Sequence, residues 1–452
     1  SRQTLTDTLA INDSMPRQRP KLLFLAYPFP PAKAPGCVRT WNIAVHLTRL
    51  GWDVTVVTPN PAILRNVEDC EKASVQLERE GIKRILTDHS WRCLTPDNLK
   101  CWNRNLGRWA GGACRVVARN LGIDKGVGWI KPSEQVCSGL AADDVDLILA
   151  TGQPFSAFSL AKRLSERLGR PYVLDYRDPW TGNPHAARHQ HLAVTRMEAG
   201  LLEGCAAVTI VSPSWGDVLD QRFGVGSKLH VVTNGYDSHE MTAVSPHAFG
   251  HCAFVYTGIF YPPKRTISPF LAALKLLKES VHGSTKEWYF HYYGIDEKHV
   301  RERADQFGLT DRVVFHGQVP RQEALSAVKG ANLAVVITSV EEEETLEDKG
   351  IVTGKIFEAV GLATPVLLIA PRGSDASAIT ASTGLVRSFR GSEFQGMASF
   401  LEDVVQGQAP QPKHMENCSW TVIAKQLDNL LQECMTSASR TRHCNFLINQ
   451  GT

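Results

Sequence analysis

The chain has 452 residues, 43% hydrophobic and 21% charged, which is typical of a globular protein with about two domains. Lys and Arg number 49 against 46 Asp and Glu, so the net charge of +3 is too small to indicate nucleic acid as a partner. No apolar run is long enough to span a membrane and no signal-peptide pattern is present, so we expect a cytoplasmic protein, with peripheral membrane contact still compatible. The 11 cysteines include no CxxC pair, which argues against a disulfide framework and a zinc site.

The first part of the chain alternates apolar strands with amphipathic helices. Residues 1–20 are polar, and we expect a flexible arm there. An apolar run at 22–26, a helical pattern over 38–50 and a second strand over 53–58 form a βαβ unit. Further strands are predicted at 82–87, 146–150, 172–175, 207–212 and 229–233, and further helices at 68–80, 104–120, 156–168 and 198–205. We therefore predict a Rossmann-like domain over residues 21–245.

Polar residues and glycines follow several of these strands. In a parallel sheet this is the carboxyl edge, where ligands bind. The candidates are Gly36, Arg39, Thr151, Gly152, Arg177, Asp178 and Trp180. A charged pair such as Arg177 and Asp178 at a strand end favours function over a place in the core.

The alternation restarts after a linker at 246–250. Strands are predicted at 253–257, 288–293, 313–316, 333–338 and 365–369, and helices at 268–280, 297–307, 321–329 and 355–362. This predicts a second doubly wound domain over residues 250–412. A helix over 421–435 has one apolar face, so we expect residues 413–436 to dock back on the body and 437–452 to be a disordered tail.

The stretch from Gly350 to Pro365 has the features of an anion site. A loop leads into a helix whose first N–H groups, near Thr353 and Gly354, point at whatever lies in front of them. Lys355 and Glu358 share one face of that helix. Gly258, Lys264 and Arg265 follow the first strand of the same domain. The alternative for each of these charges is an ordinary solvated side chain or surface ion pair.

Residues 21–59, 146–180 and 254–366 resemble the GT-B glycosyltransferases, and most closely family 4, whose members are retaining enzymes that use nucleotide sugars. The resemblance implies an α/β fold of two Rossmann-like doubly wound domains facing each other across a cleft. It implies that Gly36 lies near the donor phosphates, that Lys264 and Arg265 contact the pyrophosphate, and that Glu358 contacts the ribose hydroxyls. The family often has a second Glu eight residues before this one, and here that residue is Gly350. Glu347 or a backbone group would then have to take its place.

The expected function is that of a glycosyltransferase, hexosyltransferase-like, which moves a sugar from a nucleoside-diphosphate sugar to an acceptor hydroxyl. We expect a UDP-sugar donor, retention of configuration, no metal or other cofactor, and a carbohydrate, lipid-linked or small-molecule acceptor from cell-envelope or polysaccharide biosynthesis. The residues expected to be catalytic are Arg177, Asp178 and Lys264. Gly36, Gly258, Lys264, Arg265, Thr353, Gly354, Lys355 and Glu358 are expected to bind the donor. Arg39, Thr151, Gly152 and Trp180 are expected on the acceptor side.

Three alternatives stay open at this point. Asp178 would be the base if the reaction inverted configuration. A nucleotide-sugar epimerase can have the same two-domain architecture and needs no acceptor. A catalytically inactive partner protein that binds nucleotide sugar is also compatible with Gly350 in place of the family's Glu.

Overall fold

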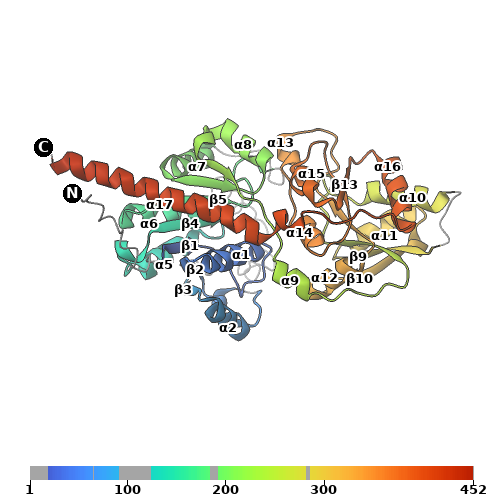
Figure 1. Ribbon diagram of the computed structural model, residues 1–452, viewed down its shortest axis with the longest axis horizontal. Helices are drawn as coiled ribbons and strands as arrows, with labels where there is room; N and C mark the ends of the chain where they lie inside the picture. The colour runs from blue at the N-terminus through green and yellow to red at the C-terminus, as the bar shows by residue number, and fades with distance from the viewer. Residues whose placement is uncertain (1–18, 65, 91–123, 184–191, 281–285, 451–452) are drawn as a thin grey trace, which may run out of the picture.

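The computed structural model describes residues 19–64, 66–90, 124–183, 192–280 and 286–450, with side chains described to residue 438. Most of the expected arm at 1–20 and the helix expected over 104–120 lie outside these ranges. Within them, two parallel sheets form two lobes side by side, each with helices on both faces (Figure 1). The predicted α/β fold of two Rossmann-like domains is therefore confirmed.

The first sheet has 7 strands in the order β3-β2-β1-β4-β5-β6-β7, and all its pairs are parallel. The strands are β1 (Lys21–Leu25), β2 (Asp53–Pro59), β3 (Lys83–Thr87), β4 (Leu147–Gly152), β5 (Tyr172–Tyr176), β6 (Ala207–Ile210) and β7 (Leu229–Val231). The helices are α1 (Gly36–Arg49), α2 (Cys70–Glu80), α5 (Val127–Cys137), α6 (Ser156–Leu168), α7 (Leu192–Gly204), α8 (Pro213–Phe223) and α9 (Ser238–Ala243). The chain order reverses between β1 and β4, which is the switch point where such sheets bind ligands.

The second sheet repeats this plan with 6 strands in the order β10-β9-β8-β11-β12-β13. The strands are β8 (Cys252–Thr257), β9 (Trp288–Tyr293), β10 (Val313–Gly317), β11 (Leu333–Ile337), β12 (Val366–Ile369) and β13 (Val386–Phe389). The helices are α10 (Ser268–Glu279), α11 (Glu297–Gln306), α12 (Arg321–Gly330), α13 (Leu346–Lys349), α14 (Gly354–Gly361), α15 (Asp375–Thr380) and α16 (Phe394–Val405). Its switch point lies between β8 and β11.

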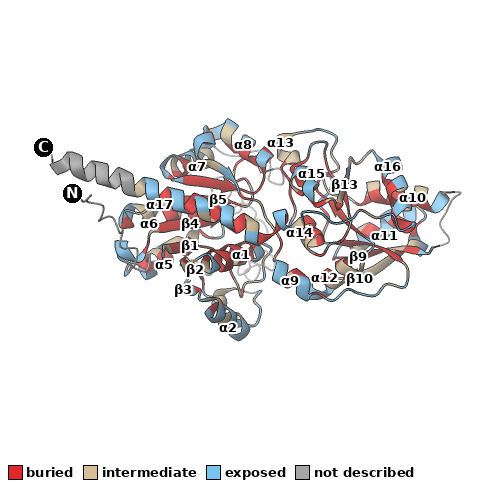
Figure 2. Ribbon diagram, in the orientation of Figure 1, coloured by how far each residue is buried: buried red, intermediate tan, exposed pale blue. Residues whose placement is uncertain are grey.

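The strands are continuously apolar because both faces of each sheet are covered. In β1, Leu23 and Leu25 belong to the core on one face, whereas Leu22 and Phe24 belong to the core on the other. Successive strand side chains alternate between faces, so helices on both sides must bury them. Figure 2 shows the result as buried strands inside helices whose outer faces are exposed.

The last helix, α17 (Trp420–Gln450), leaves the second lobe and runs back along the first (Figure 1). Trp420, Leu427 and Leu431 are buried in the same core as β1, and Trp52 Nε1 donates a 2.7 Å hydrogen bond to Asp428 Oδ1. The segment after residue 436, which we expected to be a disordered tail, continues this helix to Gln450. The sequence after residue 436 has no sustained helical spacing of apolar residues, so hydrophobic periodicity did not predict this part of the helix.

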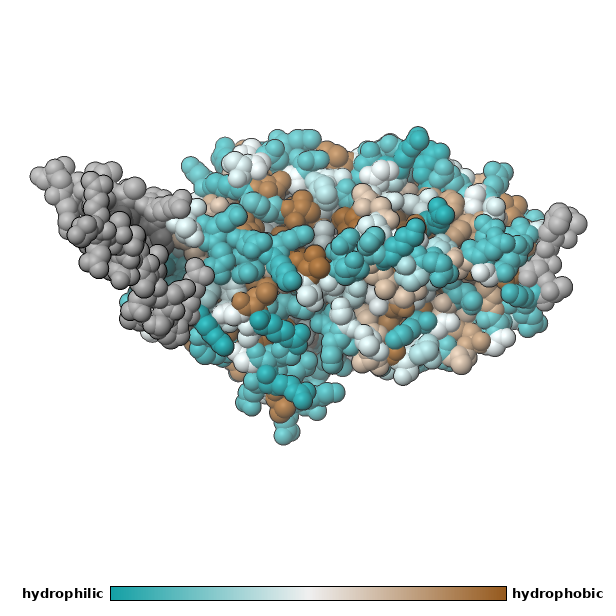
Figure 3. All heavy atoms as spheres, viewed as in Figure 1, coloured by the Kyte–Doolittle hydropathy of each residue, from teal (hydrophilic) through white to brown (hydrophobic). Residues whose placement is uncertain are grey.

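The outer surface gives little further guidance to function. The face shown in Figure 3 is mostly hydrophilic, with apolar side chains in small separate patches. None of the helices in the described ranges is both long and apolar enough to cross a membrane.

Candidate donor and acceptor site

The loop after β1 brings Gly36 against Arg177, from the loop after β5. A Cβ built on Gly36 would lie 1.7 Å from Arg177 Nη1, so only glycine leaves room for this guanidinium. Gly36 is also the first residue of α1, where the helix end carries partial positive charge. Asp178 Oδ2 lies 3.3 Å from Arg177 Nε and the Asp178 side chain is 32% exposed. A cation at a helix N-terminus, with one partly exposed partner, is arranged to meet an anion.

Arg39 and Thr151, both predicted on the acceptor side, lie instead in a buried network around Asp175. Arg39 is 2% exposed, and its Nη2 and Nε donate to Asp175 Oδ1 and Oδ2 at 2.6 and 3.0 Å. Thr151 Oγ1 donates to Asp175 Oδ2 at 2.8 Å. Burial raises the pKa of Asp175, but Arg39 and the donated hydrogen bonds outweigh it and lower the pKa overall. These two side chains therefore hold the strand ends together and present no free polar atom to an acceptor.

Gly152 and Trp180 both pack against the ring of Phe155. Trp180 stacks on Phe155 with centroids 4.9 Å apart and planes inclined by 5°. A Cβ on Gly152 would lie 2.6 Å from the same ring, so Gly152 lets Phe155 pack on the end of β4. Trp180 is partly exposed, two residues after Asp178. The exposed part of Trp180 is therefore an aromatic surface beside the charged loop, supported by the buried ring of Phe155.

The loop that contains Arg177 and Asp178 is held by Glu198 on α7, a residue that was not among our predicted site residues. Thr181 donates to Glu198 Oε2 from its backbone N at 3.2 Å and from Oγ1 at 2.5 Å. Burial raises the pKa of Glu198 to about 7, although these hydrogen bonds act in the opposite direction. The sequence signal for Glu198 was its place inside a helix that packs on the core, since a carboxylate is rarely buried there without a polar partner.

In the second domain, the structure places Lys355 across the backbone of Gly258. Gly258 has φ = +138°, a conformation that favours glycine. A Cβ built on Gly258 would lie 3.4 Å from Lys355 Cε. Thr353 caps α14 by accepting from the Lys355 backbone N at 3.4 Å. A Cβ on Gly354 would meet nothing within 4 Å, so there is open space beside the first residue of α14. These four predicted donor residues therefore lie together at the carboxyl edge of the sheet.

Lys264 and Arg265, which we predicted to act as a basic pair, have different surroundings. Lys264 Nζ lies 2.5 Å from Oδ1 of Asp348, whose side chain is 4% exposed. Arg265 lies over the ring of Tyr261 at 5.2 Å and makes no ion pair with the described residues. The Nε atom of Arg265 is buried and has no hydrogen-bond partner among the residues that the structure describes. Arg265 thus has charge available for a ligand, whereas the charge of Lys264 is already balanced.

Glu358 is held by Arg321, which begins α12 and was not among our predicted site residues. Arg321 Nη1 donates to Glu358 Oε1, and the same guanidinium bonds Glu240 at 3.1 and 3.2 Å. Lys355 Nζ lies 3.9 Å from Glu358 Oε2. The sequence could have indicated Arg321, because it follows β10 at the carboxyl edge of the sheet, the edge at which Glu358 also lies.

Gly350 lies where the two domains touch. A Cβ there would be 2.1 Å from Cδ1 of Trp215, and Ser212 Oγ donates to the Gly350 carbonyl at 2.8 Å. Trp215 Nε1 donates to the Glu347 carbonyl at 2.8 Å, and Asp375 accepts from the backbone N and Oγ of Ser214. Helix α8 of the first domain therefore fills the space in which a side chain at residue 350 would lie.

Family models match both halves of the chain. The model for Glycosyltransferase Family 4 matches residues 38–240, and the model for Glycosyl transferases group 1 matches residues 251–390. The chain is a GT-B glycosyltransferase similar to family 4. The predicted enzyme class is confirmed by these matches. Comparison of this glycosyltransferase with curated proteins gives no match.

Solved structures share the fold of this glycosyltransferase at low identity. A glycosyltransferase from Rickettsia africae is 13% identical with a TM-score of 0.59, covering 92% of this chain and 99% of its own. Sucrose-phosphate synthase from Thermosynechococcus elongatus is also 13% identical with a TM-score of 0.59, covering 95% and 100%. HepE from Anabaena, solved with UDP and glucose, is 15% identical with a TM-score of 0.55, covering 92% and 100%.

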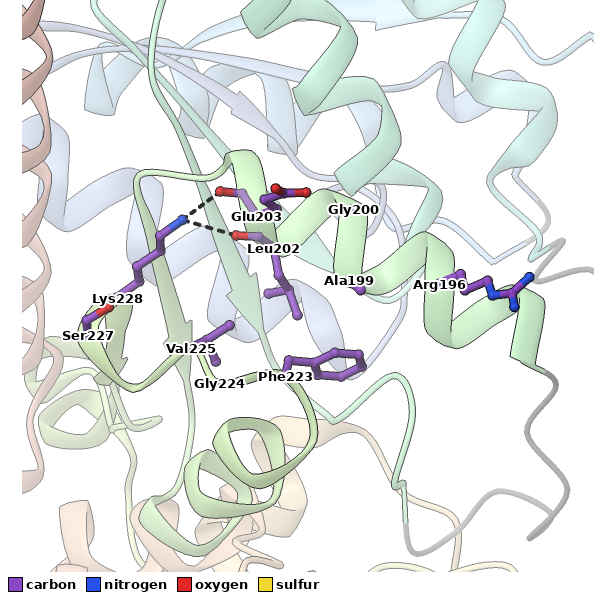
Figure 4. Close-up of a pocket in the computed structure, with 10 residues that line it drawn as sticks. All are labelled: Arg196, Ala199, Gly200, Leu202, Glu203, Phe223, Gly224, Val225, Ser227 and Lys228. Atoms are coloured by element: carbon purple, nitrogen blue, oxygen red, sulfur yellow. Dashed lines mark hydrogen bonds between the residues drawn. The ribbon is translucent and has the colours of Figure 1, made fainter.

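A hollow of about 580 Å³ in the first domain of the glycosyltransferase lies away from this site (Figure 4). It is formed by α7 and residues 223–228, at the amino edge of the first sheet. Lys228 in this hollow donates to the carbonyls of Glu203 and Leu202 at 2.7 and 3.4 Å. These carbonyls lie in the last turn of α7, so the lysine caps the end of that helix. The hollow therefore has a structural explanation and belongs to neither predicted half of the site. Within the described ranges, no three His, Cys, Asp or Glu side chains are grouped so as to hold a metal ion.

Proposed function

We propose that this glycosyltransferase takes a sugar from a nucleoside-diphosphate sugar, a UDP-sugar in the first instance, and transfers it to an acceptor hydroxyl. The observation that carries the proposal is the placement of Lys355 over Gly258, with Glu358 one turn along α14. A cation beside an open helix N-terminus suits a diphosphate, and a carboxylate on the same face suits the hydroxyls of a ribose. HepE, which shares the fold, was solved with UDP and glucose.

Departure of the nucleoside diphosphate is the step that these cations would assist. Negative charge builds on the leaving phosphates, so donors and cations fixed at that position stabilise the transition state. Lys355, Arg265 and the N-terminus of α14 lie on the donor side, and Arg177 with the N-terminus of α1 lies on the other domain. Lys264 contributes less than predicted, because Asp348 balances its charge. With these cations present, we propose a reaction that needs no metal.

We propose retention of configuration at the anomeric carbon. The bond from this carbon to the diphosphate oxygen breaks, and the acceptor oxygen bonds to the same face. The acceptor proton passes to the departing diphosphate, so no separate base is required. Arg177 would hold that diphosphate from the side of Gly36. Asp178 would become the base only in an inverting reaction.

On the acceptor side we propose a sugar hydroxyl. The partly exposed ring of Trp180, stacked on the buried ring of Phe155, offers an apolar face against which a sugar ring can lie. We assign the acceptor to cell-envelope or polysaccharide biosynthesis, where it is a carbohydrate, a lipid-linked sugar or a small glycoside. An array of these three classes tests the assignment, and a lipid-linked acceptor would also place the enzyme at the membrane surface in the cytoplasm.

The first test is a thermal-shift panel of nucleoside diphosphates and their sugars. A ligand that binds only the folded state raises the melting temperature. We expect UDP or a UDP-sugar to stabilise the wild type, and Lys355→Ala and Glu358→Ala to lose most of that shift. Lys298→Ala, which removes a lysine that is 90% exposed on α11, is the matched control. A folded wild type that no nucleotide stabilises would overturn the donor assignment.

Product analysis then separates the remaining alternatives. With donor and acceptor present, we expect a glycoside whose anomeric proton shows the donor's configuration by NMR, with undiminished yield in EDTA. The opposite configuration would refute retention, and loss of activity in EDTA would refute metal independence. Conversion of the donor to its epimer without acceptor would replace the transferase by an epimerase.

A further inference from the structure

Arg321 lies between two carboxylates from distant parts of the chain. Its Nε and Nη2 donate side-on to Oε1 and Oε2 of Glu240 at 3.1 and 3.2 Å. Its Nη1 donates to Oε1 of Glu358. The planar guanidinium thus fixes the two carboxylates relative to each other, which a lysine could not do.

The position of this arginine in α12 calls for an explanation. Arg321 is the first residue of the helix, where the partial positive charge favours an anion over a cation. Its side chain is 40% exposed, and exposed ion pairs contribute little to stability. Glu358, by contrast, is only 18% exposed. The contacts are therefore better explained by what they do to Glu358 than by the stability they add.

The clamp leaves Glu358 with one oxygen available. Oε1 is occupied by Arg321, whereas Oε2 accepts no hydrogen bond from the described residues and lies 3.9 Å from Lys355 Nζ. A carboxylate oxygen has two lone pairs, so Oε2 can accept from two neighbouring hydroxyls at once. With Oε1 held, the carboxylate cannot rotate freely, and the free oxygen keeps one direction.

Glu240 connects this clamp to the segment between the domains. It lies on α9, which follows β7 and precedes β8. Asp237 caps α9 by accepting from the Glu240 backbone N at 2.8 Å, and lies 3.5 Å from His46 Nε2 on α1. A continuous series of contacts therefore runs from α1 of the first domain through α9 and Arg321 to Glu358.

We propose that Arg321 is a positioning residue for the donor. It holds Glu358 so that the free oxygen accepts hydrogen bonds from the two ribose hydroxyls of the nucleoside diphosphate, and through Glu240 it ties this contact to the interdomain segment. The inference rests on the proposed function, because Glu358 has a ribose to bind only if this domain takes a nucleotide.

The test is a double-mutant cycle on nucleotide affinity by calorimetry, with UDP, GDP and ADP and their 2′-deoxy forms as probes. For the tightest probe we expect Arg321→Gln and Glu358→Gln each to weaken binding by roughly tenfold, the scale of one charge-assisted hydrogen bond. The double variant should bind no more weakly than Glu358→Gln alone. The 2′-deoxy probe should bind the wild type and all three variants within about threefold of one another, since one of the two hydroxyls is gone.

Two further variants exclude a general structural effect. Glu240→Gln should weaken the ribonucleotide less than Arg321→Gln, because Glu358 keeps its partner. Arg301→Gln, which breaks the exposed pair with Glu297 on α11, should leave affinity unchanged. Circular dichroism and melting temperature confirm that each variant folds.

The outcomes separate the two proposals. If Glu358→Gln weakens binding but Arg321→Gln does not, or if the two losses multiply in the double variant, the role of Arg321 is refuted while the donor site stands. If the folded wild type binds none of the probes, the proposed function fails and the inference with it.

Discussion

The indole of Trp215 lies where a side chain at Gly350 would begin, with 2.1 Å between Cδ1 of Trp215 and a Cβ built on the glycine. One residue belongs to α8 of the first domain and the other ends α13 of the second. Residue 350, where the resemblance to family 4 leads us to look for a glutamate, is thus part of the contact between the domains. A carboxylate cannot occupy this space, and the backbone carbonyl of Glu347 accepts a hydrogen bond from the same indole.

Gly350→Ala is therefore expected to destabilise the protein. The added methyl must displace Trp215 or the backbone, and overpacking of this kind costs about 1–3 kcal/mol. Urea unfolding followed by tryptophan fluorescence measures the loss. Gly354→Ala is the control, because a Cβ there meets nothing within 4 Å, and it should leave the unfolding free energy nearly unchanged. Equal stability of the two variants would contradict the contact.

Asp175→Asn is expected to be among the most destabilising single changes. It leaves the guanidinium of Arg39, 2% exposed, without a counter-charge, and breaking one partner of a buried pair costs about 3–5 kcal/mol. The matched control is Asp53→Asn, which breaks the pair with Lys83, itself 64% exposed. That variant should lose less than about 1 kcal/mol. Similar losses from both, measured by chemical unfolding, would argue against the buried network.

Glu198→Gln is expected to stabilise the protein at alkaline pH. Burial raises the pKa of Glu198 in the folded state to about 7, so the folded state binds more protons than the unfolded state between the ordinary value of 4.5 and 7. Stability therefore falls as pH rises through that window, by up to about 3 kcal/mol. Glutamine keeps an acceptor for Thr181 without the charge. Melting curves at pH 4.5 and 8 should show the variant's advantage only at pH 8, and no advantage there would contradict the prediction.

His291 is expected to make the protein less stable as pH falls, whereas Glu198 makes it less stable as pH rises. Burial and the neighbouring His316 and His251, with which it shares hydrogen bonds of 2.9 and 2.8 Å, lower its pKa to about 3. The unfolded state then binds more protons between pH 3 and 6.5, so stability is lost as pH falls below 6.5. His291→Asn should be less stable at pH 7.5 but should lose less between pH 7.5 and 5. The exposed His239→Asn is the control, and an unchanged pH dependence in His291→Asn would refute the prediction.

Much of the fold was predictable because strands and helices are local patterns. The helix predicted over residues 156–168 is α6, and Gly169 ends it in the left-handed conformation with φ = +63°. The alternation of strand and helix also implied parallel sheets, since each crossover returns to the same edge. The elements that were not predicted include α5, α8, α16 and β13 as well as the shorter helices α9, α13 and α15. The end of α17 was not predicted because its sequence has no sustained helical spacing of apolar residues.

Two doubly wound domains, their ligand-binding edges, and a helix on which Lys355 and Glu358 share one face could all be predicted from the amino-acid sequence, because each follows from spacing along a few turns of chain. Which charges are available to a ligand depends instead on contacts between residues far apart in the chain. Arg39 meets Asp175 across 136 residues and Lys264 meets Asp348 across 84, whereas Arg265 makes no ion pair with the described residues. Whether a charge is free depends on the partner that folding brings to it, and burial makes that partner obligatory, since an unpaired charge cannot be left inside a protein at acceptable free energy.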